Sequence, residues 1–463
     1  MKTFKIGGVH PHDNKQYSAG KAIQQVPLPK QAIIPLVQHI GAPAKPVVQK
    51  GDEVKVGQLI AEPGGFVSAG IHSPVSGKVL KIDEAVDAWG MKMQAIYINV
   101  EGDEWEESID RSDKLVRQCA LTSQEIIKKV AAAGIVGLGG ACFPTQVKLS
   151  VPPGKKAEVL IINGVECEPF LTCDHQLMME HTDEIIVGIT ILKKALRVEH
   201  AIVGIENNKP DAIEKMRQAA AKTTGIEIMP LKLRYPQGGE KQLIDACTGR
   251  QVPSGGLPID VGAVVDNVAT VYAVYQAVQK NKPLISRVMT VTGPSVENPG
   301  NYEVRFGTPL NDVLAAAGGI PEDTGKIIGG GPMMGRAMSN TDMCSNKRVS
   351  GLLLLPESMS VRQAPQACIR CAKCVQACPM GLEPYLLSKM AAHQMWDELI
   401  EHNIMDCIDC GCCMFTCPSY RPLLDYIRMG KGKAGGILRA RAAEAKAKAE
   451  AEKAKAETAA AKA

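Results

Sequence analysis

The chain of 463 residues carries one cysteine pattern twice, and this pattern restricts the fold more than any other feature. The first copy, CIRCAKCVQACP, begins at Cys368, and the second, CIDCGCCMFTCP, begins 39 positions later at Cys407. Both read C-x₂-C-x₂-C-x₃-C-P, a spacing that holds [4Fe–4S] clusters. Three closely spaced thiolates wrap three corners of a cubane, and the fourth normally reaches the other cluster. The proline after each run turns the chain away and removes an N–H donor. We therefore predict a domain that folds around two clusters.

The same rule assigns the cluster ligands. One cluster takes Cys368, Cys371, Cys374 and Cys417, and the second takes Cys407, Cys410, Cys413 and Cys378. Cys412 is an extra thiol that does not fit the spacing. A zinc site would show closed Cys₄ sets with a long gap between CxxC pairs. Disulfides would need an oxidising compartment, and the N-terminus does not resemble a secretory signal. Two [4Fe–4S] clusters are the better interpretation.

Composition limits the other function classes. A chain of this length is expected to hold about three or four domains. No run of about 18 apolar residues is present, so we expect no spanning helix. The net charge is +4, but from Lys431 onward nine Lys or Arg face four Glu, so the rest sums to about −1. This balance argues against nucleic-acid binding. Fifteen cysteines without a secretion signal indicate a reducing cytoplasm.

The chain reads as a multidomain α/β protein. Residues 1–110 are β-rich, and Val47–Ile82 has short alternating strands separated by glycine turns. This stretch resembles the biotinyl/lipoyl-type hammerhead. Its expected hairpin tip, Gly64–Ser68, has no lysine, so a structural or docking module is favoured over a swinging arm.

Alternating helix and strand follow over residues 115–285, which predicts a Rossmann-like α/β domain. A helix is expected after the Thr122 cap, with Glu125 completing the cap, and TDEIIVGITILKKAL predicts another between two buried strands. Residues 286–340 suit a small, soluble-ligand-binding β-grasp module. Residues 362–430 form the two-cluster domain, with helices between the runs. Residues 431–463 are an Ala/Lys/Glu-rich tail with helix propensity and no apolar stripe, expected to be solvated.

A glycine loop is the second candidate site. GIVGLGGACFPT, residues 134–145, lets backbone amides approach a ligand and cradle a phosphate. A loop of this kind alone also fits an ordinary turn. However, NGVECEPF at residues 163–170 follows an apolar strand, so its polar groups lie where α/β sheets bind cofactors. YPQGGEKQL at 235–243 and VDNVATV at 265–271 add more polar groups.

These four segments, in this order, resemble the flavin- and NADH-binding subunit of respiratory complex I. The resemblance implies an FMN site and residues that serve it: Gly137, Gly139, Gly140, Lys148, Asn163, Glu166, Gly239, Glu240, Asn267 and Thr270. It also implies that Phe143 and Glu168 serve NADH, although Phe143 could equally be a core anchor beneath the loop. The chain departs from that family at Leu138, Cys142 and Lys241, where the family has Arg, Gly and Glu. The charge reversal at Lys241 makes the NADH contact less certain than the flavin contact.

The whole arrangement is similar to the C subunit of the Rnf (Rsx) ion-translocating electron-transport complex. FKIGGVHPHDNK near the N-terminus and CTGRQVPSGGLPIDVGAVVDNVAT at residues 247–270 are also similar to that family's segments. The resemblance implies an oxidoreductase/translocase subunit, peripheral on the cytoplasmic face of the cell membrane. It would pass electrons between NADH, FMN, two [4Fe–4S] clusters and the complex's integral-membrane and iron–sulfur subunits, with ferredoxin as an indirect partner.

Two alternatives remain open at this point. One is a soluble flavin/iron–sulfur reductase, such as a cobalamin reductase or the electron donor of an amino-acid reductase. The other is a cluster-bearing scaffold without a flavin.

Overall fold

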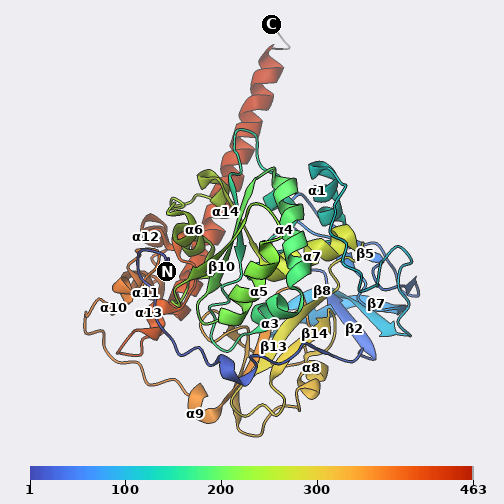
Figure 1. Ribbon diagram of the computed structural model, residues 1–463. Helices are drawn as coiled ribbons and strands as arrows, with labels where there is room; N and C mark the ends of the chain where they lie inside the picture. The colour runs from blue at the N-terminus through green and yellow to red at the C-terminus, as the bar shows by residue number, and fades with distance from the viewer. Residues whose placement is uncertain (461–463) are drawn as a thin grey trace. The chain divides into compact units, whose positions relative to one another are not determined.

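The computed structural model describes residues 1–460, which divide into two compact units (Figure 1). The large unit comprises Met1–Lys5, His10–Val252 and Gly256–Val361. The cluster unit comprises Ile6–Val9, Pro253–Gly255 and the chain from Arg362 onward. Each unit has its own hydrophobic core.

The N-terminal part of the large unit is a sandwich of two antiparallel sheets. One sheet has the order β2 (Gln31–Pro35), β8 (Lys92–Val100), β7 (Gly77–Val86) and β4 (Glu53–Val54). The other has the order β3 (Lys45–Pro46), β5 (Leu59–Glu62) and β6 (Ile71–His72). Alternating residues such as Ile96 and Ile98 point into one shared core, as period-two strands require. The lysine-free tip at Gly64–Ser68 lies between β5 and β6.

The middle of the large unit is a parallel sheet with helices on both faces (Figure 1). Its order is β11 (Ile226–Leu231), β10 (His200–Glu206), β9 (Val159–Asn163) and β12 (Ala263–Asn267). Along β9, Leu160 and Ile162 pack into one core and Val159 and Ile161 into the other, because successive side chains alternate between faces. The sheet is buried on both sides, as expected for an all-parallel sheet.

Helices α1 (Ser123–Ala132), α3 (Cys173–Glu180), α4 (Thr182–Leu196), α5 (Pro210–Ala220) and α7 (Val268–Gln279) cover one face, and α6 (Glu240–Thr248) covers the other. The short α2 (Thr145–Leu149) follows the glycine loop. Helix α1 begins with the expected capping box between Thr122 and Glu125. Helix α4 coincides with the segment predicted from its sequence.

A six-stranded mixed sheet closes the large unit. Its order is β1 (Gln24–Gln25), β14 (Gly300–Arg305), β13 (Ser286–Thr292), β17 (Gly351–Pro356), β15 (Thr324–Gly329) and β16 (Arg336–Ala337). Helices α8 (Leu310–Ala316) and α9 (Glu357–Ser360) accompany it. Two strands, β1 and β17, lie outside residues 286–340, so the sheet is larger than the module proposed from the sequence. The apolar run Leu352–Leu355 fills β17 and is buried throughout.

The cluster unit is built from a repeated motif. Helix α10 (Lys373–Gln376) lies inside the first cysteine run and α11 (Pro384–Ala392) follows it. Helix α13 (Cys412–Phe415) lies inside the second run and α14 (Leu423–Ala460) follows it, each starting 39 residues after its counterpart. Helix α12 (Trp396–Glu401) and a 3₁₀ turn at Ile404–Asp406 lie between the copies. Positive φ angles recur at equivalent positions: 57° at Arg370 and Asp409, and 57° and 78° at Ala372 and Gly411. The two runs therefore share one backbone conformation.

Helix α14 runs far beyond the core of the cluster unit (Figure 1). Its side chains from Arg439 to Glu452 are exposed, in agreement with a solvated tail. Within residues 1–460, no helix is both long and apolar enough to cross a membrane.

Candidate functional site

The predicted flavin residues converge on the carboxyl ends of two neighbouring strands. Asn163 ends β9 and Asn267 ends β12, and the two residues pair in register. Asn163 donates through Nδ2 to the Gly238 carbonyl at 2.9 Å, which fixes the Tyr235–Gly239 segment at the same edge. Three segments distant in sequence therefore meet where a parallel sheet exposes its strand ends.

Hydrogen bonds fix the backbone of the glycine loop at Leu138, and the two glycines that follow are exposed to solvent. The Leu138 amide donates to the Thr270 hydroxyl at 2.9 Å, and the Arg287 guanidinium donates to the Leu138 carbonyl at 3.0 Å. Gly139 and Gly140 are exposed. A Cβ on Gly139 would come within 2.9 Å of the Asn267 side chain, whereas one on Gly140 would meet nothing within 4 Å. The loop thus presents backbone amides to open space, which an anionic group requires.

The departures from the complex I pattern have structural explanations. Leu138 is buried in the main core of the domain, where the Arg of that family would need a polar partner. Cys142 has a φ of 53°, a conformation that suits the glycine of that family better than a residue with a Cβ. Its buried thiol donates to the Lys347 carbonyl at 3.2 Å, which holds it in place.

Asn267 has a local structural role beside the candidate site. Its side-chain oxygen accepts from the Ala269 amide at 2.9 Å and caps α7. Its Nδ2 donates to Asp174 at 2.7 Å. Burial, followed by the charge of Glu166, raises the pKa of Asp174 to about 7. Both polar atoms of Asn267 are therefore already engaged, so its orientation is fixed.

A cluster of charged residues, from the exposed Glu240 to the buried Asp266, lies beside the same edge. Lys148 donates to Glu240 at 3.0 Å and to the Val265 carbonyl at 2.7 Å. Burial lowers the pKa of Lys148, but Glu240 and Asp266 outweigh burial and raise it. Asp266 is 2% exposed, and neither of its carboxylate oxygens has a hydrogen-bond partner. Burial raises its pKa to about 6, although Lys148 partly opposes the shift.

An orphaned buried carboxylate calls for a donor that the protein does not provide. The N–H of a flavin ring or the hydroxyls of its ribityl chain are donors of this kind. Lys148 and the amides of the glycine loop suit the phosphate of FMN. Helix α6 begins after Gly239, with no side-chain cap at its N-terminus, so its dipole also favours an anion there. The residues present therefore fit FMN.

Glu166 and Glu168 have different surroundings. Glu166 accepts from the amides of Asp174 and His175 at 2.8 and 3.1 Å, at the start of α3. Glu168 accepts from the Met333 and Met334 amides at 3.1 and 2.8 Å, and from the Tyr235 hydroxyl at 3.2 Å. In this structure Glu168 therefore connects the flavin domain to the Gly330–Gly335 loop.

Two further features concern the predicted NADH contacts. Phe143 is half-buried, and its carbonyl accepts from the Gly137 amide at 2.9 Å, so it closes the glycine loop. Burial raises the pKa of Glu168. The Lys15 ammonium donates to the Glu166 and Glu168 carbonyls at 3.0 Å each and fixes the backbone between the two acids.

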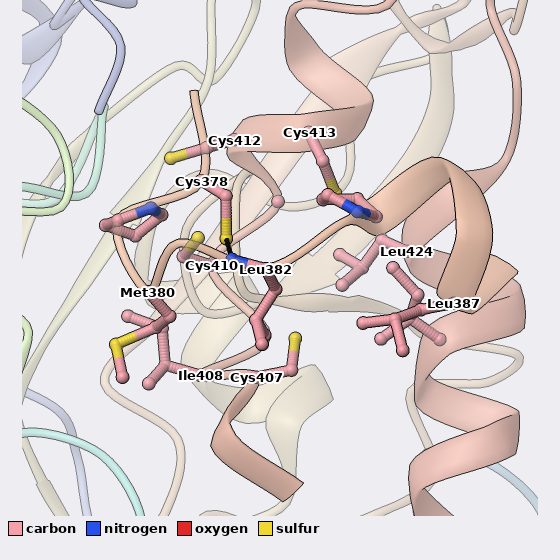
Figure 2. A pocket seen from close by; sticks show the side chains of 14 residues that line it. Cys378, Met380, Leu382, Leu387, Cys407, Ile408, Cys410, Cys412, Cys413 and Leu424 are labelled. Atoms are coloured by element: carbon pink, nitrogen blue, oxygen red, sulfur yellow. Dashed lines mark hydrogen bonds between the residues drawn. The ribbon is translucent and has the colours of Figure 1, made fainter. Parts of the chain in front are cut away.

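The cysteines of the second ligand set surround one pocket. Figure 2 shows Cys378, Cys407, Cys410 and Cys413 around it, with Leu382, Leu387 and Leu424 in the apolar part of the wall. The Leu382 and Asp409 amides donate to the sulfurs of Cys378 and Cys407, each at 3.4 Å. Amide donors of this kind stabilise the negative charge of ligating thiolates. The pocket thus brings together one predicted ligand from the first run and three from the second.

The other set also crosses between the two runs. The Cys374 thiol lies close enough to Cys417 for the two charges to interact, although burial is the larger cause of its raised pKa. Tyr385 in α11 interacts with both Cys374 and Cys368. Among residues 1–460, no three of these eight sulfurs lie within 4.8 Å of one another.

Cys412 is 0% exposed and lies in the wall of the same pocket (Figure 2). A hydrogen bond with Cys410 is the largest cause of its raised pKa.

Sequence reasoning missed Asp266, Lys15 and Arg287. For Asp266 a signal was available: it is a carboxylate inside the apolar strand Ala263–Asn267. Lys15 and Arg287 gave no local signal, because their partners lie about 150 residues away along the chain.

Comparisons with known proteins agree with this division of the chain. Four family descriptions match in order: "RnfC Barrel sandwich hybrid domain" at residues 2–103, "Nuo51 FMN-binding domain" at 130–276, "SLBB domain" at 288–337 and "4Fe-4S dicluster domain" at 360–418. The predicted fold class is thereby confirmed.

Full-length relatives are also similar. The C subunit of a proton-translocating ferredoxin:NAD⁺ oxidoreductase complex from Clostridium ljungdahlii is 48% identical, with 94% of each chain covered. The C subunit of a Na⁺-translocating complex of the same kind from Acetobacterium woodii is 43% identical, with 93% of this chain and 96% of that protein covered. An NAD⁺-reducing [NiFe]-hydrogenase structure in the H₂-reduced state has a TM-score of 0.46 at 19% identity, covering 67% of this chain and 62% of the hydrogenase chain.

Proposed function

Because the chain belongs to the family of C subunits of ion-translocating ferredoxin:NAD⁺ oxidoreductase complexes, we propose that it is the subunit that meets the nicotinamide. The chain is a subunit of a membrane complex that couples this oxidoreduction to ion translocation, and it has an FMN-binding domain and a 4Fe-4S dicluster domain. Bound FMN supplies the chemistry that takes up electrons as a hydride and releases them singly, as the clusters require.

The residues at the strand ends have distinct proposed roles in holding FMN. The amides of Gly137, Gly139 and Gly140 and the ammonium of Lys148 hold the phosphate, next to the N-terminus of α6. Asp266 accepts hydrogen bonds from N–H or hydroxyl donors of the flavin, which would satisfy its two oxygens. Asn163, Asn267 and Thr270 act mainly by fixing the loops around the ring.

We expect the remaining predicted residues to support the same site. Glu240 holds Lys148 in place, Gly239 leaves the helix start accessible, and Glu166 anchors the start of α3. Phe143 and Glu168 stay as proposed nicotinamide contacts: the ring for stacking, and the carboxylate for the amide or ribose hydroxyls. The buried carboxylate of Glu168 already accepts three donors, so its position is fixed before a substrate binds.

We further propose that the immediate partners are integral-membrane and iron–sulfur subunits of the same complex, and that ferredoxin exchanges electrons indirectly. The chain would lie peripherally on the cytoplasmic face, where NADH and ferredoxin are found. Fractionation with inverted and right-side-out vesicles tests this placement, since only one orientation exposes a peripheral subunit to protease.

One observation carries the FMN proposal. The glycine loop, Lys148 and Asp266, whose carboxylate has no hydrogen-bond partner, lie together at the carboxyl ends of the parallel strands. The test is anaerobic purification followed by acid release of flavin and iron analysis. We expect one non-covalent FMN and about eight iron atoms per chain. Reduction of the flavin by NADH is then followed by stopped-flow absorbance.

Two variants act as controls for each other. Gly139→Trp places a large ring against Asn267 and should remove the flavin while the iron content is kept. Cys374→Ala should lose a cluster and keep the flavin, because the two sites belong to different compact units. Release of no flavin by wild-type protein, or full flavin in Gly139→Trp, would show that the site is misassigned.

The soluble-reductase alternative predicts a different association. A soluble reductase would purify without membrane proteins, whereas a complex subunit should co-purify with integral-membrane chains from gently solubilised membranes.

A further inference from the structure

The two cysteine runs have the same backbone conformation but opposite charge. Arg370 in the first run and Asp409 in the second occupy equivalent positions, each with a φ of 57°. Lys373 follows Arg370 in the first run, and residues 358–382 contain no Asp or Glu. Asp409 is instead paired with Lys431 at 3.4 Å. Glu383 lies just beyond this stretch, and its carboxylate accepts from Tyr385, which interacts with Cys368 and Cys374. Arg370 and Lys373 therefore give the first run an excess of positive charge, while the acidic residue of the second run is paired.

The two ligand sets also differ in exposure. Cys368 and Cys371 are exposed, whereas Cys378, Cys410 and Cys413 are buried. Large apolar side chains beside the exposed set also face solvent: Ile369 is 68% exposed, Phe415 53% and Tyr420 55%. Exposed aromatic and aliphatic side chains rimmed by charge are typical of a protein interface. The cluster of Cys368, Cys371, Cys374 and Cys417 thus lies under an apolar, cationic surface, which we call the first-run face.

We propose that the first-run face is where this chain exchanges single electrons with an acidic iron–sulfur protein. This inference rests on the proposed function. Arg370 and Lys373 have no carboxylate partner among residues 1–460, and both are exposed, so an anionic surface can pair with them. Complementary charge of this kind steers association and fixes the register of docking.

The electron balance needs only the nicotinamide and the partner. One NADH becomes NAD⁺ and a proton and gives up two electrons. Each electron would leave singly through the cluster held by Cys368, Cys371, Cys374 and Cys417, and would reduce one oxidised cluster of the partner by one electron. In the opposite direction, two singly reduced partner clusters supply the two electrons for one NAD⁺. No further oxidant or reductant is needed.

Charge reversal tests the docking surface. The probe is a reduced two-[4Fe–4S] ferredoxin of acidic composition, used in place of the iron–sulfur subunit and mixed with the oxidised full-length chain in a stopped-flow instrument. Arg370→Glu/Lys373→Glu should slow the second-order oxidation of ferredoxin at least 10-fold at low salt, and less than about 2-fold at 0.5 M salt. The matched control is Lys446→Glu/Lys448→Glu, an equal charge change on the exposed part of α14, which should leave the rate unchanged. Equal slowing in both double variants would overturn the proposed surface.

Cluster deletion tests whether electrons enter at the exposed cysteine set, and electron paramagnetic resonance is the readout. In Cys410→Ala, reduced ferredoxin should still reduce the remaining cluster. In Cys371→Ala, reduced ferredoxin should reduce neither the remaining cluster nor the flavin. The reverse pattern would overturn the assignment. NADH should bleach the flavin in both variants and in wild type, and its failure in wild type would count against the proposed function instead.

Discussion

At the scale of single residues, the two cysteine runs place different residues in the same backbone conformation, so their effects on stability can be compared. Ala372 and Gly411 occupy equivalent positions with φ of 57° and 78°. A left-handed conformation costs a residue with a Cβ about 1–2 kcal/mol, whereas glycine adopts it freely. Ala372→Gly should therefore stabilise the cluster domain by roughly 0.5–1 kcal/mol after the larger entropy of the unfolded chain is subtracted.

The measurement is thermal loss of the iron–sulfur absorbance under anaerobic conditions. Gly411→Ala should lower the transition temperature, and Ala440→Gly, the same exchange in the helical part of α14, should not raise it. A lower transition temperature for Ala372→Gly would mean that another interaction of its methyl group outweighs the strain.

Asp266 gives a pH-dependent prediction. Burial raises its pKa to about 6, from an ordinary value of 3.8. The folded protein thus binds more protons than the unfolded one between these values, so stability is highest below about pH 4 and falls as the pH rises through 6. In flavin-free protein, Asp266→Asn should raise the free energy of unfolding at pH 7 by roughly 2 kcal/mol.

Differential scanning fluorimetry of flavin-free wild type and Asp266→Asn across pH 4–8 measures this effect. The two melting curves should converge near pH 4. The same variant should bind FMN less tightly, because an amide offers one acceptor oxygen in place of two. If the melting temperatures of the two proteins differ by the same amount at every pH, folding does not raise the pKa of Asp266.

The sequence identified individual residues only where a motif repeats or is strongly patterned. The eight cluster cysteines follow from spacing, because a cubane restricts the distances between ligands. The present contacts of Glu168 could not be foreseen, since Met333 and Met334 lie about 165 positions away. Likewise, no local pattern marks Lys15, which binds carbonyls more than 150 residues away.

At the scale of elements, the local sequence is sufficient to predict helices that have complete caps and strands that have a regular hydrophobic period. Helix α1 has its capping box, and α4 has acidic residues in its first turn and lysines in its last. The edge strand β1 has only two residues and pairs in parallel with β14, so it carries no periodic signal. Strand β17 cannot be assigned to the sheet from its own residues, because a short apolar run alone does not reveal its partners.

The contact between Glu168 and the Gly330–Gly335 loop makes a prediction about this element. Glu168→Ala removes the acceptor of two backbone amides, of which that of Met333 is part-buried and that of Met334 exposed, so we expect a cost of about 0.5–1.5 kcal/mol per bond. We expect faster protease cleavage of the loop and a KM for NADH about 10-fold higher, with flavin content unchanged.

Glu168→Gln separates the two roles of this side chain. Its amide oxygen can still accept from one loop amide, so protease resistance should largely return. If Glu168 also binds the nicotinamide nucleotide, the KM should remain raised in Glu168→Gln. Recovery of both properties would mean that Glu168 only holds the loop.

At the scale of the whole molecule, one buried lysine joins the three regions of the large unit. Lys347 is 0% exposed, and its ammonium donates to the Gly70 carbonyl of the N-terminal sandwich at 3.1 Å and to the Gly134 carbonyl of the flavin domain at 2.8 Å. Burial lowers the pKa of Lys347 to about 8. Nearby His72 has its pKa lowered to about 3, by burial first and by Lys347 second, so it stays neutral beside the ammonium.

Lys347→Ala should therefore loosen the large unit without affecting the clusters. It leaves two buried carbonyls without a donor and creates a cavity, which costs about 2–5 kcal/mol. The folded pKa lies below the ordinary 10.5, so wild-type stability rises as the pH increases through 8, when the buried amine loses its charge but can still donate. The stability lost in Lys347→Ala should thus be larger at pH 9 than at pH 7.

The measurement follows the two units separately on heating. Release of flavin reports unfolding of the large unit, and loss of iron–sulfur absorbance reports unfolding of the cluster unit. Lys30→Ala, at an exposed position, is the control. A loss of clusters in parallel with the flavin would show that the two units unfold together, and an unchanged flavin transition would show that Lys347 does not join these regions.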